Sequence, residues 1–212
     1  WCIGALLCAL ATVAQAGDAE VPALYVGPFA GYHTVPGFLL SFEADTYPKG
    51  GLKGHAEGIR FGYNFNDAYS LGGVLFHSDV SGSGPWGQRG KAESYGVAGT
   101  ARGTVDMDVL GVGIEGARRF HIWNSLGLVT RLGLGVGYVD VNFDGSFDGY
   151  VIDYPDHKIH EPAHEHRNRI IPLLGLGASL EWRPLRNLVI SAGPHWNTGF
   201  GAEASVSYLF DF

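Results

Sequence analysis

The chain has 212 residues, 33 of them glycine, and a formal net charge of −7. Its length suits one domain or one small barrel, its acidity argues against a nucleic-acid partner, and after residue 16 no run of about 18 apolar residues could cross a membrane as a helix. Any membrane span after residue 16 would therefore be a closed β-barrel, because lipid offers no hydrogen-bond partner to an open sheet edge.

The first sixteen residues have the pattern of a secretory signal peptide that is truncated at its N-terminal end. An apolar, uncharged run over 3–13 is followed by the small-x-small site Ala14-Gln15-Ala16 and by a polar segment over 17–22. This is the hydrophobic region and cleavage site of an exported protein, and 17–22 is expected to be a short periplasmic segment. Cys2 and Cys8 both lie in the signal, so the exported chain is expected to have no disulfide and no thiolate site.

Eight stretches after residue 22 alternate as β-strands do. Successive side chains of a strand point to opposite faces. Most of these stretches set bulky apolar residues against glycine, small or charged ones, whereas the first and third alternate too irregularly to be oriented. The stretches are 23–33, 55–65, 69–78, 104–118, 126–141, 169–183, 188–197 and 202–212. A glycine face is a poor solvent face but a good lining for a narrow lumen, so the bulky face is expected to point outward.

The connections between these stretches alternate in length. Those after strands two, four and six are short, whereas those after strands one, three and five are long: about 34–54, 79–103 and 142–168. Short periplasmic turns alternating with long external loops are the layout of membrane barrels. The sequence therefore predicts an all-β, eight-stranded antiparallel up-and-down transmembrane barrel over 23–212, with both termini in the periplasm.

Aromatic residues gather toward both ends of the predicted strands. Those near the short turns are Tyr63, Phe65, Tyr69, Phe120, Trp123, Trp182, Tyr208, Phe210 and Phe212, and those toward the long connections are Tyr32, Phe76, Tyr138 and Trp196. Two girdles are expected where amphipathic rings meet the two interfaces of a membrane.

On these features the chain resembles the small eight-stranded outer-membrane barrels of the OmpA, OmpW and opacity-protein type. The resemblance covers about residues 23–212 and rests on strand count, loop alternation, glycine-lined faces and the terminal Tyr208-Leu-Phe-Asp-Phe212. It implies the outer membrane of a Gram-negative-type envelope, contact with outer-membrane lipid, and recognition of the C-terminal strand by the barrel-assembly machinery. It includes no family-specific motif, so it implies no functional residues.

Charged residues at inward positions are predicted to form a network in the lumen. They are Arg60, Glu115, Arg131, Glu181, His195 and Glu203. A buried charge is costly unless it is paired, so the two arginines are expected to pair with the three glutamates. A network that plugs the lumen is favoured, because eight-stranded barrels are normally filled by side chains; a polar path for small solutes is the alternative.

The connection over 142–168 holds candidate metal ligands, and no other cofactor is expected. Its histidines are His157, His160, His164 and His166. Imidazole with neighbouring carboxylates suits zinc, copper or nickel, and the spacing lets several rings converge if the loop folds back. A solvated surface loop, or a charge switch near the ordinary histidine pKa of about 6.5, accounts for the same residues.

Three functions are compatible with this sequence. The first is a structural or surface-interaction role, in which the long external loops meet an external ligand or surface partner. The second is a narrow porin-like channel or a carrier of small molecules. The third is an outer-membrane lipid-modifying enzyme, for which the neighbouring His77 and Ser78 are the nearest match to a His-Ser pair; no residue is assigned a catalytic role.

Overall fold

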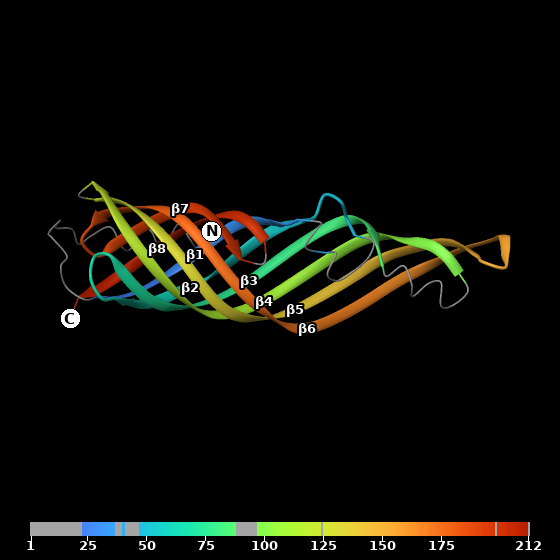
Figure 1. The fold of residues 1–212 in the computed structure, drawn as a ribbon, viewed down its shortest axis with the longest axis horizontal. Coiled ribbons are helices and arrows are strands. Elements are labelled where there is room, and N and C mark those ends of the chain that lie inside the picture. Colours follow the sequence, from blue (N-terminus) through green and yellow to red (C-terminus); the bar gives the residue numbers. More distant parts are fainter. Residues whose placement is uncertain are drawn as a thin grey trace, which may run out of the picture.

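The computed structural model describes residues 23–36, 40, 47–87, 97–123, 125–197 and 199–211. They form a closed barrel of eight antiparallel strands, each paired with its neighbours in the chain (Figure 1). The strands are β1 (Ala23–Val35), β2 (Leu52–Asn64), β3 (Tyr69–Trp86), β4 (Val97–Trp123), β5 (Leu126–Val151), β6 (Tyr154–Leu185), β7 (Leu188–Asn197) and β8 (Gly199–Asp211). The all-β, up-and-down architecture expected from the sequence is confirmed. The predicted signal peptide at 1–16, the segment 17–22 and Phe212 lie outside the described residues.

Side-chain alternation sets the inside and the outside of the barrel. On β5, Leu132, Leu134 and Val136 are 51–59% exposed on the outer wall, while the glycines between them face the lumen. Glycine is required where the interior is tight: a Cβ on Gly72 would lie only 2.5 Å from the Tyr25 hydroxyl oxygen. Large apolar residues therefore cover the outer wall, the reverse of a soluble barrel.

The short turn between β2 and β3 is fixed by one side chain. The Asn66 Oδ1 atom accepts hydrogen bonds from the backbone N–H groups of Ala68 (2.8 Å) and Tyr69 (2.9 Å). Asparagine commonly closes a turn in this way. The turn lies at the same end of the barrel as the start of β1, because Ala23 is opposite Asn64.

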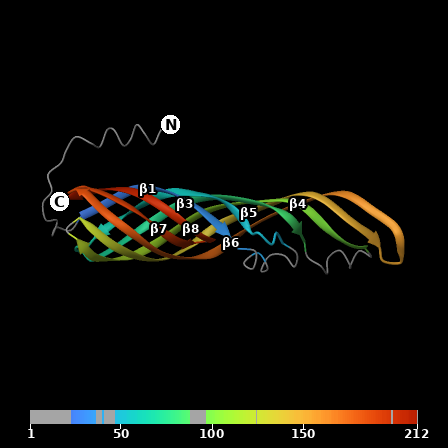
Figure 2. The same cartoon turned by 90° about the horizontal axis from the view of Figure 1, so that it is seen from above.

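Strands β3 to β6 continue as a tapering sheet beyond the other four strands, hereafter the extension (Figures 1 and 2). Pairing of β5 with β6 runs as far as Val151 opposite Tyr154, whereas β6 pairs with β7 only as far as Leu176. The segment 142–168, expected as a loop, is thus mostly paired strand. Pro162 is accommodated because prolines are tolerated in edge strands, and in the described chain β6 is the edge there.

The half of the lumen nearest the extension is filled by an apolar core. Its buried members are Phe29, Val35, Leu40, Leu52, Phe76, Val80, Trp86, Val105, Met107, Val109, Val139, Phe143 and Leu173. Phe76 is only 4% exposed and points inward, so its predicted place in an aromatic girdle is wrong. Tyr32 and Tyr138 do face outward, and Trp196 stacks on Phe200 with ring centroids 6.0 Å apart. No helix in the described part of the chain is long and apolar enough to span a bilayer.

Candidate functional site

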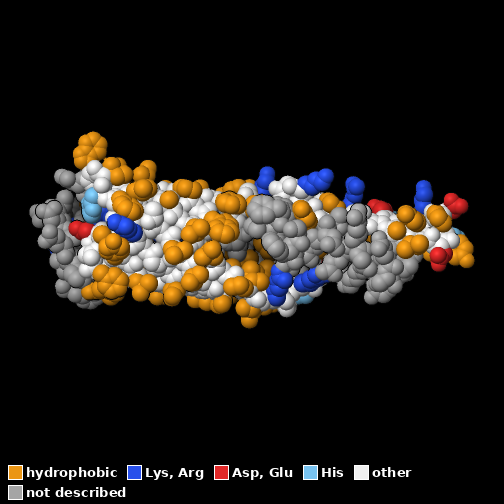
Figure 3. Space-filling view, in the orientation of Figure 1, with side chains coloured by type: hydrophobic (Ala, Val, Ile, Leu, Met, Phe, Trp, Pro, Cys, Tyr) orange, Lys and Arg blue, Asp and Glu red, His pale blue; other side chains and the backbone are white. Residues whose placement is uncertain are grey.

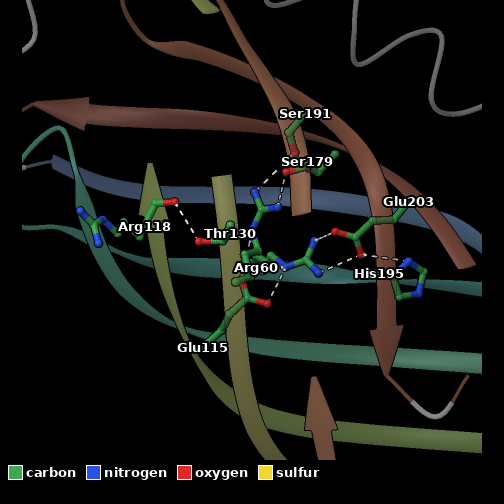
Figure 4. A network of polar contacts seen from close by, with 10 residues as sticks. Arg60, Glu115, Arg118, Thr130, Ser179, Ser191, His195 and Glu203 are labelled. Carbon is green, nitrogen blue, oxygen red and sulfur yellow. Dashed lines mark hydrogen bonds and ion pairs between the residues drawn. The ribbon is translucent and has the colours of Figure 1, made fainter. Parts of the chain in front are cut away.

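An ion-pair network lies in the middle of the lumen, below the apolar core (Figure 4). Arg60 on β2 bridges two carboxylates, with its Nε 3.3 Å from Glu115 Oε1 on β4 and its Nη1 2.8 Å from Glu203 Oε1 on β8. Arg131 on β5 approaches Glu115 Oε1 from the other side at 3.4 Å, and His195 Nδ1 lies 3.9 Å from Glu203 Oε2. The structure brings these five predicted residues together, and their side chains are only 6–13% exposed.

Polar and aromatic neighbours complete the coordination of the two arginines. The Arg131 Nη1 donates a hydrogen bond to Ser179 Oγ at 2.5 Å, and Ser191 and Ser205 bond to each other at 2.7 Å close by. The Arg60 guanidinium carbon lies 4.1 Å from the centroid of the Phe29 ring, a cation–π contact that joins the network to the apolar core.

The sixth predicted residue, Glu181, belongs to a separate cluster at the short-turn end. Its Oε1 lies 2.9 Å from Arg119 Nε and 3.0 Å from Arg183 Nε, and Arg183 Nη1 lies 3.6 Å from Asp67 Oδ1 in the turn between β2 and β3. Arg119 and Arg183 were not among the predicted residues. Arg119 lies one residue beyond the predicted end of the fourth strand, and its inward position follows only if that strand continues.

The apolar core and the two ion-pair clusters leave little free space in the described lumen. A cavity of about 50 Å³ beside the network is lined by Phe29, Phe76, Arg60 and Leu173, among others, and a second of about 60 Å³ lies beside Tyr25. Spaces of this size hold a few water molecules and are far smaller than the roughly 300–1,000 Å³ of ligand pockets. The described lumen is therefore a packed interior.

The His77 and Ser78 side chains lie on opposite faces of β3. His77 points outward, with its Nε2 3.2 Å from Asp108 Oδ1, while Ser78 is fully buried and hydrogen-bonded through Oγ to His33 Nε2 at 2.9 Å. His77 cannot act on Ser78 across the sheet. The buried Ser78–His33 pair has no exposure through which to reach a substrate.

A row of polar residues crosses the outer wall where the extension begins. Strand register sets His55 opposite Asp79, Asp79 opposite Asp108, Asp108 opposite Asp140 and Asp140 opposite Asn168. Aligned like charges destabilise a sheet, and histidines contact two of these aspartates: the His77 Nε2 lies 3.2 Å from Asp108 Oδ1, and the His166 Nδ1 lies 3.1 Å from Asp140 Oδ1. Above this row, the outer face of the extension is polar.

The histidines of the proposed metal site are spread along β6. His160 and His164 each pair with an aspartate across the sheet, at 2.6 Å from Asp148 and 3.0 Å from Asp144. From His160 to His166 the strand rises roughly 20 Å, and the fourth histidine, His157, stacks edge-on against Tyr154 instead. Among the described residues no three His, Cys, Asp or Glu side chains form a group that could hold a metal ion.

No family model matches the chain, and no curated protein matches its sequence. It is similar in structure to Ail, the attachment invasion locus protein of Yersinia pestis (17% identity, TM-score 0.42, covering 90% of this chain and 99% of that one). It is also similar to neisserial surface protein A (13% identity, TM-score 0.46, covering 93% and 100%). Both are eight-stranded outer-membrane β-barrels, the class that the sequence resembles. At these identities the likeness concerns the fold alone, so function is argued from the residues of this chain.

Proposed function

We propose that this protein spans the outer membrane as a closed barrel and acts through its extension, which binds a ligand or partner outside the cell. The observation that carries this proposal is the division of the outer wall into an apolar band and a polar extension. The packed lumen supports a structural and surface-interaction role over transport.

The apolar band has the height that a membrane requires. On β4 the outward side chains from Leu110 to Phe120 are apolar apart from Gly116 and Arg118, and this is about the nine to eleven residues that a tilted membrane strand needs. On the face drawn in Figure 3, hydrophobic side chains cover the barrel, and most Lys and Arg side chains lie at or beyond the start of the extension. Such a surface favours lipid, since soluble proteins rarely expose apolar patches of this size.

The positions of the short turns, the strand ends and the extension also support one orientation of the barrel in the membrane. The described short turns, the start of β1 and the end of β8 share one end of the barrel, while the extension lies at the other. In membrane barrels the short turns face the periplasm and the longer connections face outward. We therefore place both termini in the periplasm and the extension outside the cell.

Reconstitution into planar lipid bilayers should give no defined single-channel conductance. The described lumen is closed in two layers, by apolar side chains in the half nearest the extension and by the Arg60 network below them. The control is migration on SDS gels with and without boiling, where a shift on heating shows that the reconstituted protein is a closed barrel. Reproducible current steps from heat-shifting protein would contradict the closed lumen and favour the channel.

Shortening the extension should abolish surface binding and leave the barrel intact. Residues 145–163 can be replaced by an Asn-Gly turn, because Asp144 and His164 are opposite each other and would flank the new turn. Cells displaying the full or the shortened protein would be compared for attachment to a panel of immobilised glycans and extracellular proteins. We expect attachment only with the full protein, and the same heat shift for both; attachment that is equal for the two would overturn the role of the extension.

A further inference from the structure

A groove on the outer wall of the barrel lies between the short turns and the middle of the apolar band. It has a volume of about 580 Å³, within the range of ligand pockets. Its apolar lining includes Leu71, Ile114, Leu132, Leu134 and Leu176. The groove exists because Gly116 takes an outward position of β4, with Leu71 and Leu132 directly opposite it on the neighbouring strands.

One cation lies at the end of the groove nearest the short turns. Arg118 follows Gly116 on the outward face of β4, and its guanidinium carbon is 4.7 Å from the Phe120 ring centroid and 5.5 Å from that of Tyr69. In Figure 4 its side chain points away from the lumen network. The two rings hold the guanidinium at the level of the aromatic residues that mark this end of the apolar band.

Arg118 differs from the arginines of the lumen in having no carboxylate partner within the described part of the chain. Arg60, Arg119 and Arg131 each pair with a glutamate, whereas Arg118 forms no ion pair with any described residue. An arginine on the lipid-facing wall is strongly destabilising at the bilayer midplane and much less so at the interface. Its position therefore suits an anion supplied by the membrane itself.

We propose that this groove binds one phospholipid of the periplasmic leaflet, with its phosphate on Arg118 and an acyl chain over Gly116. The inference rests on the membrane location proposed above. The groove runs from a cation at the interface to apolar side chains in the middle of the band, which is the order of phosphate and chain in a phospholipid. A planar guanidinium donates two parallel hydrogen bonds to phosphate oxygens. Thr130, directly opposite Arg118 on β5, also lines the groove, and its hydroxyl donates a hydrogen bond to the Arg118 carbonyl oxygen at 3.4 Å.

Filling the groove tests the proposal without disturbing the fold. A Cβ added at Gly116 meets no atom within 4 Å, so Gly116→Leu should insert and fold normally. The matched control, Ala204→Leu, adds the same side chain to an exposed position on the outer wall of β8. Arg118→Gln removes the cation and leaves the groove open, and it serves as an independent variant if Gly116→Leu does not fold.

Intact-protein mass spectrometry from detergent micelles, with added phosphatidylglycerol, measures the bound lipid. We expect one lipid on the wild type and on Ala204→Leu, and at least tenfold weaker binding to Gly116→Leu and Arg118→Gln. Diacylglycerol with the same chains should bind the wild type at least tenfold less than phosphatidylglycerol.

Besides a wild type that binds no lipid, three results would overturn the proposal. They are equal lipid binding by Gly116→Leu and the wild type, equal binding of diacylglycerol and phosphatidylglycerol, or a protein dimer that Gly116→Leu abolishes, which would assign the groove to a second copy of the chain. The heat shift on SDS gels separates this proposal from the previous one. A wild type that shifts but binds no lipid contradicts only the lipid site, whereas a wild type that does not shift contradicts the membrane barrel itself.

Discussion

Replacing Arg60 with methionine should lower the free energy of unfolding by about 3–5 kcal/mol, the usual cost of removing one partner from a buried ion pair. The substitution leaves Glu203 without an arginine partner in the lumen, where water cannot fully solvate it, and leaves Glu115 with Arg131 alone. Urea unfolding of the protein in lipid vesicles, followed by tryptophan fluorescence, measures the change. A loss below about 1 kcal/mol, the range of exposed ion pairs, would show that solvent reaches the network.

Two further variants identify the cause of this loss. Arg102→Met removes an exposed arginine from the extension and should change stability little. Adding Glu203→Gln to Arg60→Met removes the carboxylate that has lost its arginine and leaves Glu115 paired with Arg131, so it should recover much of the loss, since neutral replacements of a buried ion pair are often tolerated. No recovery in the combined variant would assign the cost to the packing of Arg60 against Phe29 rather than to charge.

The sequence predicted the network residues where alternation is regular. Arg60 and Arg131 lie in stretches that set bulky apolar residues strictly against glycine or charge, so their inward direction could be read directly. Direction alone does not give height in the barrel, and Glu181 was therefore grouped with the wrong arginines. The register, in which Glu181 lies opposite Gly127 near the short turns, places it beside Arg119.

The sequence did not predict the inward direction of Phe76 or the strand pairing of the extension, and the residue pattern explains both failures. On β3, Gly72 and Gly73 are adjacent, so neither face of the strand reads as bulky, and the inward direction of Phe76 could not be determined. The extension was expected as a loop because its β6 half, 158–168, has histidine or charged residues on both faces and therefore shows no hydrophobic alternation. This part of β6 is held by its pairing with β5, whose inward Phe143 belongs to the apolar core.

Replacing Phe76 with alanine should cost about 3–5 kcal/mol of unfolding free energy, as expected for a large side chain removed from a packed core. Phe76 belongs to the apolar core of the lumen, and its ring lies directly over Gly111, where a Cβ would come within 2.3 Å of it. The neighbouring Leu75→Ala is the matched control, because Leu75 is 48% exposed on the outer wall, where lipid replaces the lost atoms and no cavity forms. The same vesicle unfolding experiment compares the two.

The ratio of the two losses in unfolding free energy shows which face of the sheet packs into the core. A larger loss for Phe76→Ala places the core in the lumen and lipid outside, whereas a larger loss for Leu75→Ala would require another protein surface on the outer wall. Phe76→Ala also enlarges the cavity beside Arg60, yet it should stay non-conducting, because the Arg60 network still crosses the lumen below it. If the variant conducts, the apolar core rather than the charged network closes the barrel.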